Sequence, residues 1–262
     1  MLDFIIMENQ KYSYPDKDDG ITVDLIIKNS EPYHGYWGLS EAKALSFFYK
    51  TIKKQTHDSL LDLAAGKGRL TIEFAPYFKK VVALEPDHER IKEAKKNCHN
   101  AGIDNIHFVE SLFLGADLKD SSFNVVVCSH LIQHIPAIFI GQTFKKIFNI
   151  LKPGGILLLT TSYTKEDQNR FEKHSRIIEH IDEETFNDLI INNRENILPV
   201  QYFSMKYLKN LLVDFQIIKI WHFHDESKRF WPDRVIFRDT LLNFLGIDFG
   251  RDVLMLMKKP LL

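Results

Sequence analysis

The sequence predicts an α/β protein in which a mostly parallel sheet is covered by helices on both faces. Short apolar runs alternate with amphipathic segments, and a glycine-containing turn at Gly66 and Gly68 directly follows the first clear apolar run. Residues 123–128 form a continuous, valine-rich apolar run, which is typical of a strand buried on both faces. The 262 residues are enough for one such domain with additions.

The composition is that of an ordinary globular protein, with 45% hydrophobic and 26% charged residues. A net charge of -1 argues against a strongly basic surface for nucleic acid or for anionic membranes. The two cysteines, Cys98 and Cys128, are too few for a disulfide framework. Residues 1–7 lack the basic flank of a signal peptide, and no apolar run approaches the roughly 20 residues of a membrane span. We therefore expect a cytoplasmic protein with no membrane segment.

The central unit of the chain is a predicted strand, turn, helix and second strand. The apolar run at 60–63 is too short for a helix and leads directly into the glycine turn. Leu70, Phe74 and Tyr77 are then spaced at helical intervals, and the next apolar run ends in Glu85. A βαβ unit of this kind brings the turn, the helix N-terminus and Glu85 to one edge of the sheet.

The residues around the turn favour a nucleoside-bearing cofactor that carries no phosphate. A dinucleotide fingerprint needs a third small residue, but Thr71 occupies that position. Asp62 would place a negative charge beside a phosphate. A cofactor with an amino-acid head avoids both difficulties, because Asp62 can face its positive region while Glu85 accepts hydrogen bonds from both ribose hydroxyls. S-adenosylmethionine meets this description.

The N-terminal extension, residues 1–38, contains a possible strand at 21–27 and ends in an aromatic, glycine-rich loop. A helix is expected from residue 40 to about residue 53. Tyr36 and Trp37, in the loop, either cap the core or fold over the cofactor.

Beyond Glu85 the sequence continues to alternate between helices and strands. The elements expected here are a helix at 87–100, strands at 106–109, 123–128 and 156–161, and a helix through Phe144, Ile147 and Leu151. Asp87 is a plausible N-cap of the first helix, which ends at Gly102. Residues 152–155 form a tight turn before the last of these strands.

Together these motifs resemble those of the class I S-adenosylmethionine-dependent methyltransferases. The family pattern of an acid, any residue and Gly-x-Gly-x-Gly reads here Asp62-Leu63-Ala64-Ala65-Gly66-Lys67-Gly68, with Ala64 in place of the first glycine and Glu85 as the next acid. The later Leu-Lys-Pro-Gly-Gly turn also matches, so the resemblance covers about residues 40–162. It implies a Rossmann-like, seven-stranded sheet of order 3-2-1-4-5-7-6 whose last strand is antiparallel.

The resemblance also implies which residues surround S-adenosylmethionine. In the family, a polar or acidic residue after the third strand contacts the adenine amino group, and Glu110 occupies that position, unless it is simply a solvated loop carboxylate. The expected cofactor-binding residues are Tyr36, Trp37, Asp62, Ala64, Ala65, Gly66, Gly68, Glu85, Pro86, Glu110, Ser111, Ser129 and His130.

The remaining third of the chain extends the same single domain, 1–262. The expected divisions are the extension at 1–38, a cofactor-binding core at 39–162, a lid or substrate insertion at 163–203, and C-terminal strands at 204–262 with a second insertion at 225–250. Ser204 can cap a helix over 205–213. Strands at 215–223 and 252–258 supply the antiparallel end of the sheet.

Methyl transfer needs a positioned acceptor and, where the acceptor has a proton to lose, a base. The acceptor is expected over the ends of the fourth and fifth strands, beside Ser129, His130, His134 and Tyr163. His130 and His134 are the candidate catalytic bases, because imidazole titrates near neutral pH. The alternative is that one or both are structural, as a loop cap or in the core.

The histidine spacings allow a metal interpretation, which we do not favour. His130 and His134 are four residues apart, and His222 and His224 end a predicted strand. Neither pair is accompanied by a cysteine or carboxylate ligand pattern, so no metal site is expected.

The expected function is methyl transfer to an oxygen or nitrogen of a small-molecule acceptor. The loop Cys128-Ser129-His130-Leu131 departs from the Asn/Asp-Pro-Pro-Tyr of adenine methyltransferases, and Cys128 lacks the neighbours of an RNA cytosine-C5 methyltransferase. One alternative is tRNA or protein methylation, with the two insertions as recognition surfaces. Nucleic acid is therefore an open partner, although not the favoured one. Another is a non-catalytic, nucleoside-binding module. The acceptor, the base and the oligomeric state stay open.

Overall fold

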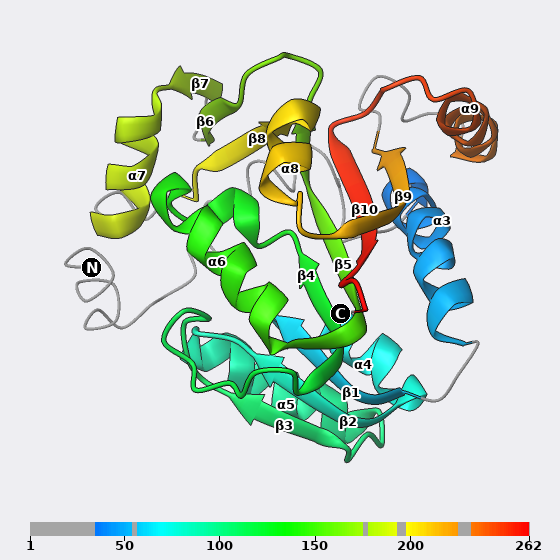
Figure 1. The fold of residues 1–262 in the computed structure, drawn as a ribbon, viewed down its shortest axis with the longest axis vertical. Coiled ribbons are helices and arrows are strands. Elements are labelled where there is room, and N and C mark those ends of the chain that lie inside the picture. The colour runs from blue at the N-terminus through cyan, green and yellow to red at the C-terminus, as the bar shows by residue number, and fades with distance from the viewer. Residues whose placement is uncertain (1–34, 54–56, 175–177, 193–197, 225–231, 262) are drawn as a thin grey trace.

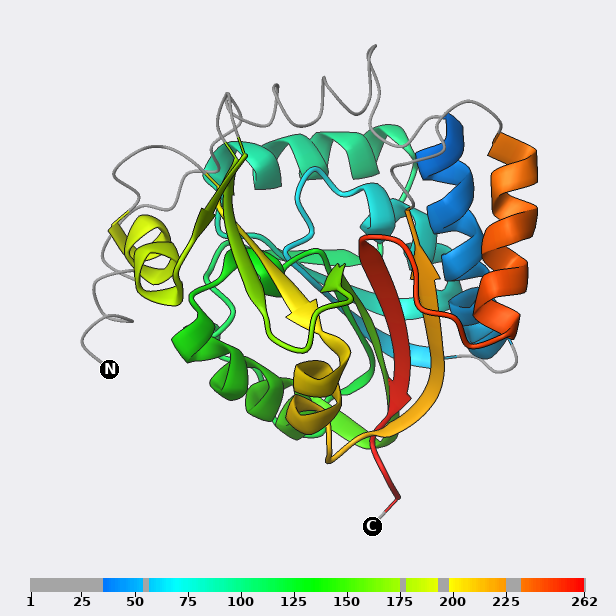
Figure 2. The same ribbon diagram turned by 90° about the horizontal axis from the view of Figure 1, so that it is seen from above.

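The computed structural model describes residues 35–53, 57–174, 178–192, 198–224 and 232–261 (Figure 1). Most of the expected N-terminal extension, including its predicted strand at 21–27, lies outside the described residues. In the described part, a mixed sheet carries helices on both faces (Figure 2), as the sequence predicts.

The sheet has the strand order expected from the sequence. Its parallel part contains, in spatial order, β3 (Ile106–Val109), β2 (Phe78–Leu84), β1 (His57–Leu63), β4 (Phe123–Ser129) and β5 (Leu151–Thr164). Next to β5 lies the antiparallel strand β10 (Asp252–Lys258), followed by β9 (Gln216–Phe223), which is antiparallel to β10. The order β3-β2-β1-β4-β5-β10-β9 is the predicted 3-2-1-4-5-7-6, so the expected fold is confirmed.

Helices bury both faces of the central strands. The helices in the described part of the chain are α3 (Gly35–Ile52), α4 (Arg69–Phe74), η1 (Ala75–Tyr77), α5 (His88–Asn100), η2 (Ile132–His134), α6 (Ala137–Ile150), α7 (Glu183–Asn192), α8 (Met205–Leu211) and α9 (Pro232–Phe244). Leu61 and Leu63 of β1 pack with residues of α6 and α8, whereas Leu60 packs on the opposite face with residues of α3 and α4. Because both sets of side chains are fully buried, the parallel strands are held as a rigid platform.

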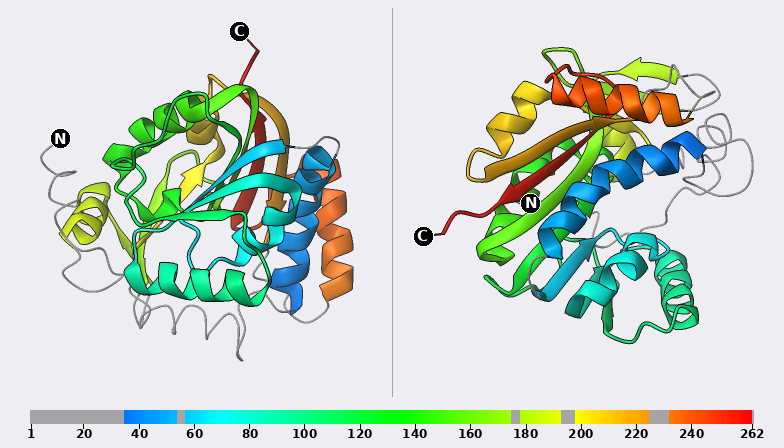
Figure 3. Two further views of the ribbon diagram at one scale, coloured as in Figure 1. Left: turned by 90° about the horizontal axis from the view of Figure 1, so that it is seen from below. Right: turned by 90° about the vertical axis from the view of Figure 1, so that its right-hand side faces the viewer.

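The helix that covers β9 and β10 begins earlier than predicted. Residues 35–38, expected as an aromatic, glycine-rich loop, belong to α3. Ala44, Leu45 and Phe48 of α3 are buried in the core, and this packing outweighs the cost of about 1 kcal/mol for each glycine in a helix. Figure 3 shows α3 lying along β9 and β10.

The predicted insertion at 163–203 builds additional strands onto the sheet. β6 (Arg170–His174) and β7 (Ile178–Ile181) form a hairpin, and β6 pairs with β8 (Val200–Ser204). The ladder between β8 and β5 consists of Tyr163 opposite Phe203 and Thr164 opposite Ser204. We call β6, β7, α7 and β8 the side branch; its role as a lid stays a prediction.

Two later elements agree with their sequence signals. Ser204 caps α8, because its Oγ accepts a hydrogen bond from the Tyr207 N–H at 3.2 Å. In the second insertion α9 packs against α3, whereas residues 225–231 lie outside the described part. Among the helices that the structure describes, none has the length and apolar character needed to cross a membrane.

Two glycines with a left-handed φ, one in the turn after β1 and one after α5, differ in the space around them. Gly68 has φ +87°, and a Cβ there would lie 3.3 Å from the Ala94 Cβ of α5; Gly102 has φ +69° and open space around it. We expect Gly102→Ala to cost about 1–2 kcal/mol, from the left-handed conformation alone. Gly68→Ala should cost more, because the added methyl group presses on α5. Urea unfolding of both variants measures the difference, and equal losses would contradict it.

Candidate active site

A left-handed turn connects β1 to α4 at the carboxyl edge of the sheet. Ala64 and Gly66 both have φ +56°, and Gly68 precedes α4. The Ala65 N–H donates to the Leu84 carbonyl at 2.9 Å, and the Gly68 N–H donates to the Ala65 carbonyl at 2.9 Å. These bonds tie the turn to the end of β2. Ala64 has a left-handed backbone conformation, which glycine adopts at a lower cost than alanine. This explains why the family pattern has a glycine at this position.

Glu85 lies at the end of β2 with its carboxylate directed at the turn. Its Oε2 accepts a hydrogen bond from the Gly66 N–H at 2.8 Å, and its Oε1 accepts one from the Asp87 N–H at 3.1 Å. Burial raises the pKa of Glu85, against the opposing influence of Arg90 and the two N–H groups. The Arg90 guanidinium also lies close to Gly66, since a Cβ there would be 2.8 Å from its Nη2. A carboxylate, a guanidinium and the backbone of the turn thus share one small area.

Asp62 is buried beneath the turn rather than exposed at its surface. It is 2% exposed, and its Oδ2 accepts a hydrogen bond from the Thr71 hydroxyl at 2.6 Å. Burial raises the pKa of Asp62 to about 7, although Thr71 and Arg69 lower it. Arg69 itself forms an ion pair with Glu41 of α3 at 2.7 Å. Asp62 therefore joins β1 to α4, and its charge changes near neutral pH.

The other predicted cofactor contacts are spread along the same edge. Glu110 follows β3, and its half-exposed carboxylate lies 3.0 Å from Nδ1 of His88 in the first turn of α5. The Ser111 hydroxyl donates to the Leu112 carbonyl, and Pro86 is half-buried beside Glu85. The side chains of Tyr36 and Trp37 lie outside the described residues. The proposed roles of these residues stay predictions.

The loop after β4 holds His130 in an unusual conformation. His130 has φ +50°, and its N–H donates to the Thr160 carbonyl at 2.9 Å. The hydroxyls of Ser129 and Thr160 lie 2.8 Å apart and share a hydrogen bond. A non-glycine residue with a left-handed φ is held by its surroundings and is found preferentially at functional sites. Burial lowers the pKa of His130, which favours the neutral ring.

A buried glutamine determines which ring nitrogen of His130 carries the proton. Gln133 Oε1 accepts hydrogen bonds from the Ser162 N–H at 3.3 Å and the Thr161 hydroxyl at 3.1 Å. The Gln133 amide N–H₂ therefore faces His130 Nδ1, at 3.1 Å. Since an amide nitrogen only donates, Nδ1 accepts, and the neutral ring carries its proton on Nε2. Nε2 is buried and has no hydrogen-bond partner in the described part of the chain.

His134 has the opposite arrangement. Its Nδ1 lies 3.0 Å from the Pro199 carbonyl, which can only accept, so the proton of the neutral ring is on Nδ1 and the lone pair is on Nε2. Of the two predicted bases, His134 has the tautomer that a base acting through Nε2 needs. It also links η2 to the segment before β8.

The antiparallel strands bring further histidines to the same edge, each paired with a carboxylate. His224 Nδ1 lies 2.7 Å from Asp252 Oδ2, and both residues are buried. His222 Nε2 lies 3.2 Å from Asp248 Oδ1, while the Tyr163 hydroxyl donates to Asp248 Oδ2 at 2.9 Å. The sequence analysis identified the His222-x-His224 spacing but missed both aspartates. In the sequence the two aspartates are marked only by position, since Asp248 lies just before the last strand and Asp252 begins it.

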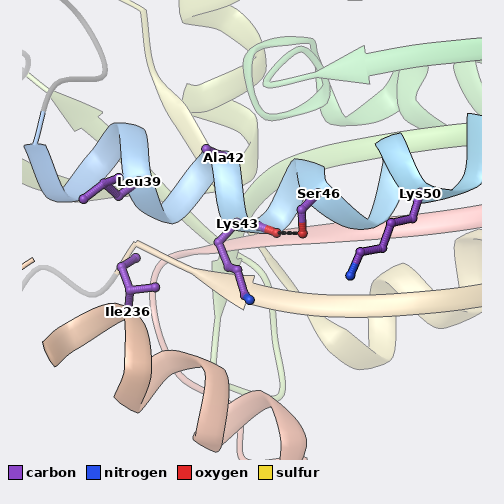
Figure 4. A pocket seen from close by; sticks show the side chains of 6 residues that line it. All are labelled: Leu39, Ala42, Lys43, Ser46, Lys50 and Ile236. Atoms are coloured by element: carbon purple, nitrogen blue, oxygen red, sulfur yellow. Dashed lines mark hydrogen bonds between the residues drawn. The ribbon is translucent and has the colours of Figure 1, made fainter. Parts of the chain in front are cut away.

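The described residues contain no group of three or more histidine, cysteine, aspartate or glutamate side chains able to hold a metal ion. A hollow of about 500 Å³ lies elsewhere, between α3 and α9 (Figure 4). Its walls are formed by Leu39, Ala42, Lys43, Ser46, Lys50 and Ile236. None of the predicted site residues contributes to it, so the candidate active site is the carboxyl edge.

Comparison with known proteins finds similarity to methyltransferases. Residues 60–155 match a family model described as a methyltransferase domain. The chain is 24% identical over 140 residues to the uncharacterized methyltransferase YcgJ of Bacillus subtilis, covering 53% of this chain and 54% of YcgJ. It is 28% identical over 153 residues to the ubiquinone/menaquinone biosynthesis C-methyltransferase UbiE of Wigglesworthia glossinidia brevipalpis, covering 57% of each. The chain thus spans little more than half the length of these curated relatives.

Solved structures share the fold at low sequence identity. The crystal structure of YcgJ aligns with a TM-score of 0.57 at 15% identity, over 84% of this chain and 99% of that chain. A Burkholderia thailandensis 1,6-didemethyltoxoflavin-N1-methyltransferase, with bound 1,6-didemethyltoxoflavin and S-adenosylhomocysteine, aligns with a TM-score of 0.58 at 14% identity, over 96% of this chain and 93% of that chain.

The buried Asp62 makes a prediction about stability. Its pKa of about 7 in the folded chain exceeds the ordinary 3.8, so the folded state binds more protons between these values and stability falls as pH rises from about 4 to about 7. Asp62→Asn keeps an oxygen for the Thr71 hydroxyl but cannot ionise, so it removes this loss of stability. At about 1.4 kcal/mol per pKa unit, the loss at pH 8 is up to about 4 kcal/mol.

Thermal unfolding from pH 5 to pH 8 measures this effect. Asp58→Asn is the matched control, because Asp58 is on the same strand but exposed, in a surface ion pair with Lys79. An unchanged pH profile in Asp62→Asn would contradict the prediction.

Proposed function

We propose that this chain, whose core is a class I S-adenosylmethionine-dependent methyltransferase domain, transfers a methyl group to an oxygen or nitrogen of a small molecule. The observation that carries the proposal is the position of Glu85. Its buried carboxylate faces the left-handed turn at the end of the neighbouring strand, where an adenosyl group would lie.

The residues at the turn fit S-adenosylmethionine. Each Glu85 oxygen accepts one hydrogen bond from a backbone N–H, and a carboxylate oxygen has a second lone pair, so both oxygens can also accept a ribose hydroxyl. Gly66 leaves room for the Arg90 guanidinium beside the turn, since a Cβ there would lie 2.8 Å from its Nη2. Glu85 supplies negative charge for a cationic cofactor, and Asp62, with a pKa of about 7, adds to it above neutral pH. When bound, S-adenosylmethionine supplies the methyl group together with a sulfur leaving group.

The acceptor is placed over the ends of β4 and β5, where the chain offers several polar side chains. Ser129 ends β4, His130 follows it in the loop, and His134 lies in η2. If the acceptor atom carries a proton, His134 has the tautomer suited to take it. An acceptor that reacts through an existing lone pair needs only orientation and exclusion of water.

A small-molecule acceptor is favoured over nucleic acid. The net charge of -1 provides no general attraction for phosphates. The tRNA/tmRNA (uracil-C(5))-methyltransferases of Nitratiruptor and Campylobacter concisus match 22% and 47% of this chain, less than the 53% that YcgJ matches. Both cysteines are buried, and burial raises the pKa of Cys128 to about 12, so neither thiol suits a nucleophilic mechanism on a base. The Burkholderia enzyme carries a small acceptor in a similar fold.

Calorimetry with S-adenosylmethionine and S-adenosylhomocysteine tests the cofactor site. We expect both to bind, and Glu85→Gln to weaken binding about tenfold to a hundredfold, because a charged hydrogen bond is worth about 1.5–3 kcal/mol. Glu89→Gln is the control, since Glu89 is nearby but exposed, at 77% of its side-chain area. If neither compound binds at millimolar concentration, the proposal fails.

An acceptor screen scored by homocysteine release, after hydrolysis of the product, tests the acceptor site. With an acceptor that loses a proton, we expect His134→Gln to lower kcat about 10²–10⁴-fold while cofactor affinity is unchanged. His180→Gln serves as the control because His180 is mostly exposed. Full activity of His134→Gln would exclude His134 as the base.

A further inference from the structure

The loop after β4 contains a directed chain of hydrogen bonds that ends at a buried N–H group. The chain begins at the Ser162 backbone N–H of β5, passes through the Gln133 side-chain amide and ends on the His130 ring. Each link is fixed in direction, because a backbone N–H can only donate and an amide oxygen can only accept. The last group in the chain is the Nε2–H of His130.

The surroundings keep His130 neutral and immobile. Its ring lies edge-on to Phe223, with the ring centroids 6.4 Å apart. Asp252 and Glu41 favour the charged ring, whereas burial, His224 and Arg69 oppose it, and the pKa of His130 is lowered overall. These groups come from β10, α3, the end of β9 and α4. The left-handed backbone fixes the direction of the side chain further.

The Nε2–H group of His130, at the end of this series of hydrogen bonds, has no partner in the described residues. A buried N–H without a hydrogen bond costs about 1–3 kcal/mol, and such groups are rare in folded proteins unless a water or ligand completes them. The Nε2 atom belongs to a residue that follows β4, at the carboxyl edge of the sheet, where the proposed function puts the acceptor. A polar atom of the acceptor would satisfy it.

We propose that His130 is a hydrogen-bond donor to the methyl acceptor rather than a base, and that the acceptor carries an oxygen or nitrogen lone pair that receives this bond. This inference rests on the proposed methyltransferase function. It restricts the acceptor to molecules with a lone pair at or beside the methylated atom, such as a carbonyl, carboxylate, hydroxyl or unprotonated ring nitrogen. A molecule presenting only an N–H donor without a lone pair to His130 would leave both groups without a partner.

A substitution of Gln133 can reverse which ring nitrogen of His130 donates and which accepts. In Gln133→Glu, one carboxylate oxygen still accepts from Ser162, while the other faces His130 Nδ1 and must receive a proton from it. The neutral ring then carries its proton on Nδ1, and Nε2 becomes an acceptor. A donor role predicts that kcat/KM falls about tenfold to a hundredfold in this variant, whereas a base role for Nε2 predicts an increase.

The tautomer is measured directly by long-range ¹H–¹⁵N NMR of the full chain with S-adenosylhomocysteine, which needs no acceptor. We expect the Nε2–H form of His130 in the wild type and the Nδ1–H or doubly protonated form in Gln133→Glu. Gln142→Glu is the control, because Gln142 is exposed on α6 and the same charge there should leave the tautomer unchanged. His130→Asn, which tolerates a left-handed φ, assigns the signal.

The outcomes separate the two proposals. An Nδ1–H form in the wild type, or faster methyl transfer by Gln133→Glu, would overturn the donor role even if the cofactor binds normally. Absence of cofactor binding would overturn the proposed function and leave the tautomer measurement valid. If Gln133→Glu does not fold, the wild-type spectrum alone decides.

Discussion

The hydrogen bond from the Gly66 N–H to the Glu85 carboxylate is the interaction on which the cofactor half of the site depends. It joins the turn after β1 to the end of β2, so the turn cannot move away from β2 without removing a hydrogen bond from the buried Glu85 carboxylate. β1 is buried on both faces, which fixes where β1 and β2 end relative to each other. The relative position of the turn and Glu85 is thus set by the sheet.

The acceptor half is built by a different principle. There the antiparallel strands β9 and β10 bring chain segments from far along the sequence to the same edge, where His224 contacts Asp252. His224 has φ +58°, and its N–H donates to Ser40 of α3. Gly250 is required beside it, because a Cβ there would lie 2.3 Å from the Phe223 carbonyl oxygen. Fixed polar groups in a buried setting need little reorganisation when a substrate arrives.

Sequence reasoning predicted the part of the molecule that depends on local patterns. Apolar runs gave the parallel strands, and the capping role of Asp87 is confirmed, since its side chain accepts from the Arg90 N–H. The side branch was missed because its strands are short and its polar segments gain order only from pairing with β5. The partners of His130 and His224 were equally hidden, since a hydrogen bond between distant residues leaves no periodic signal.

The attachment of the side branch has a consequence for how such a protein diversifies. Its ladder to β5 consists of the pairs Tyr163–Phe203 and Thr164–Ser204, immediately beyond the stretch of β5 that is paired with β10. The side branch can therefore differ between related chains while the seven-stranded ladder keeps its own pairings.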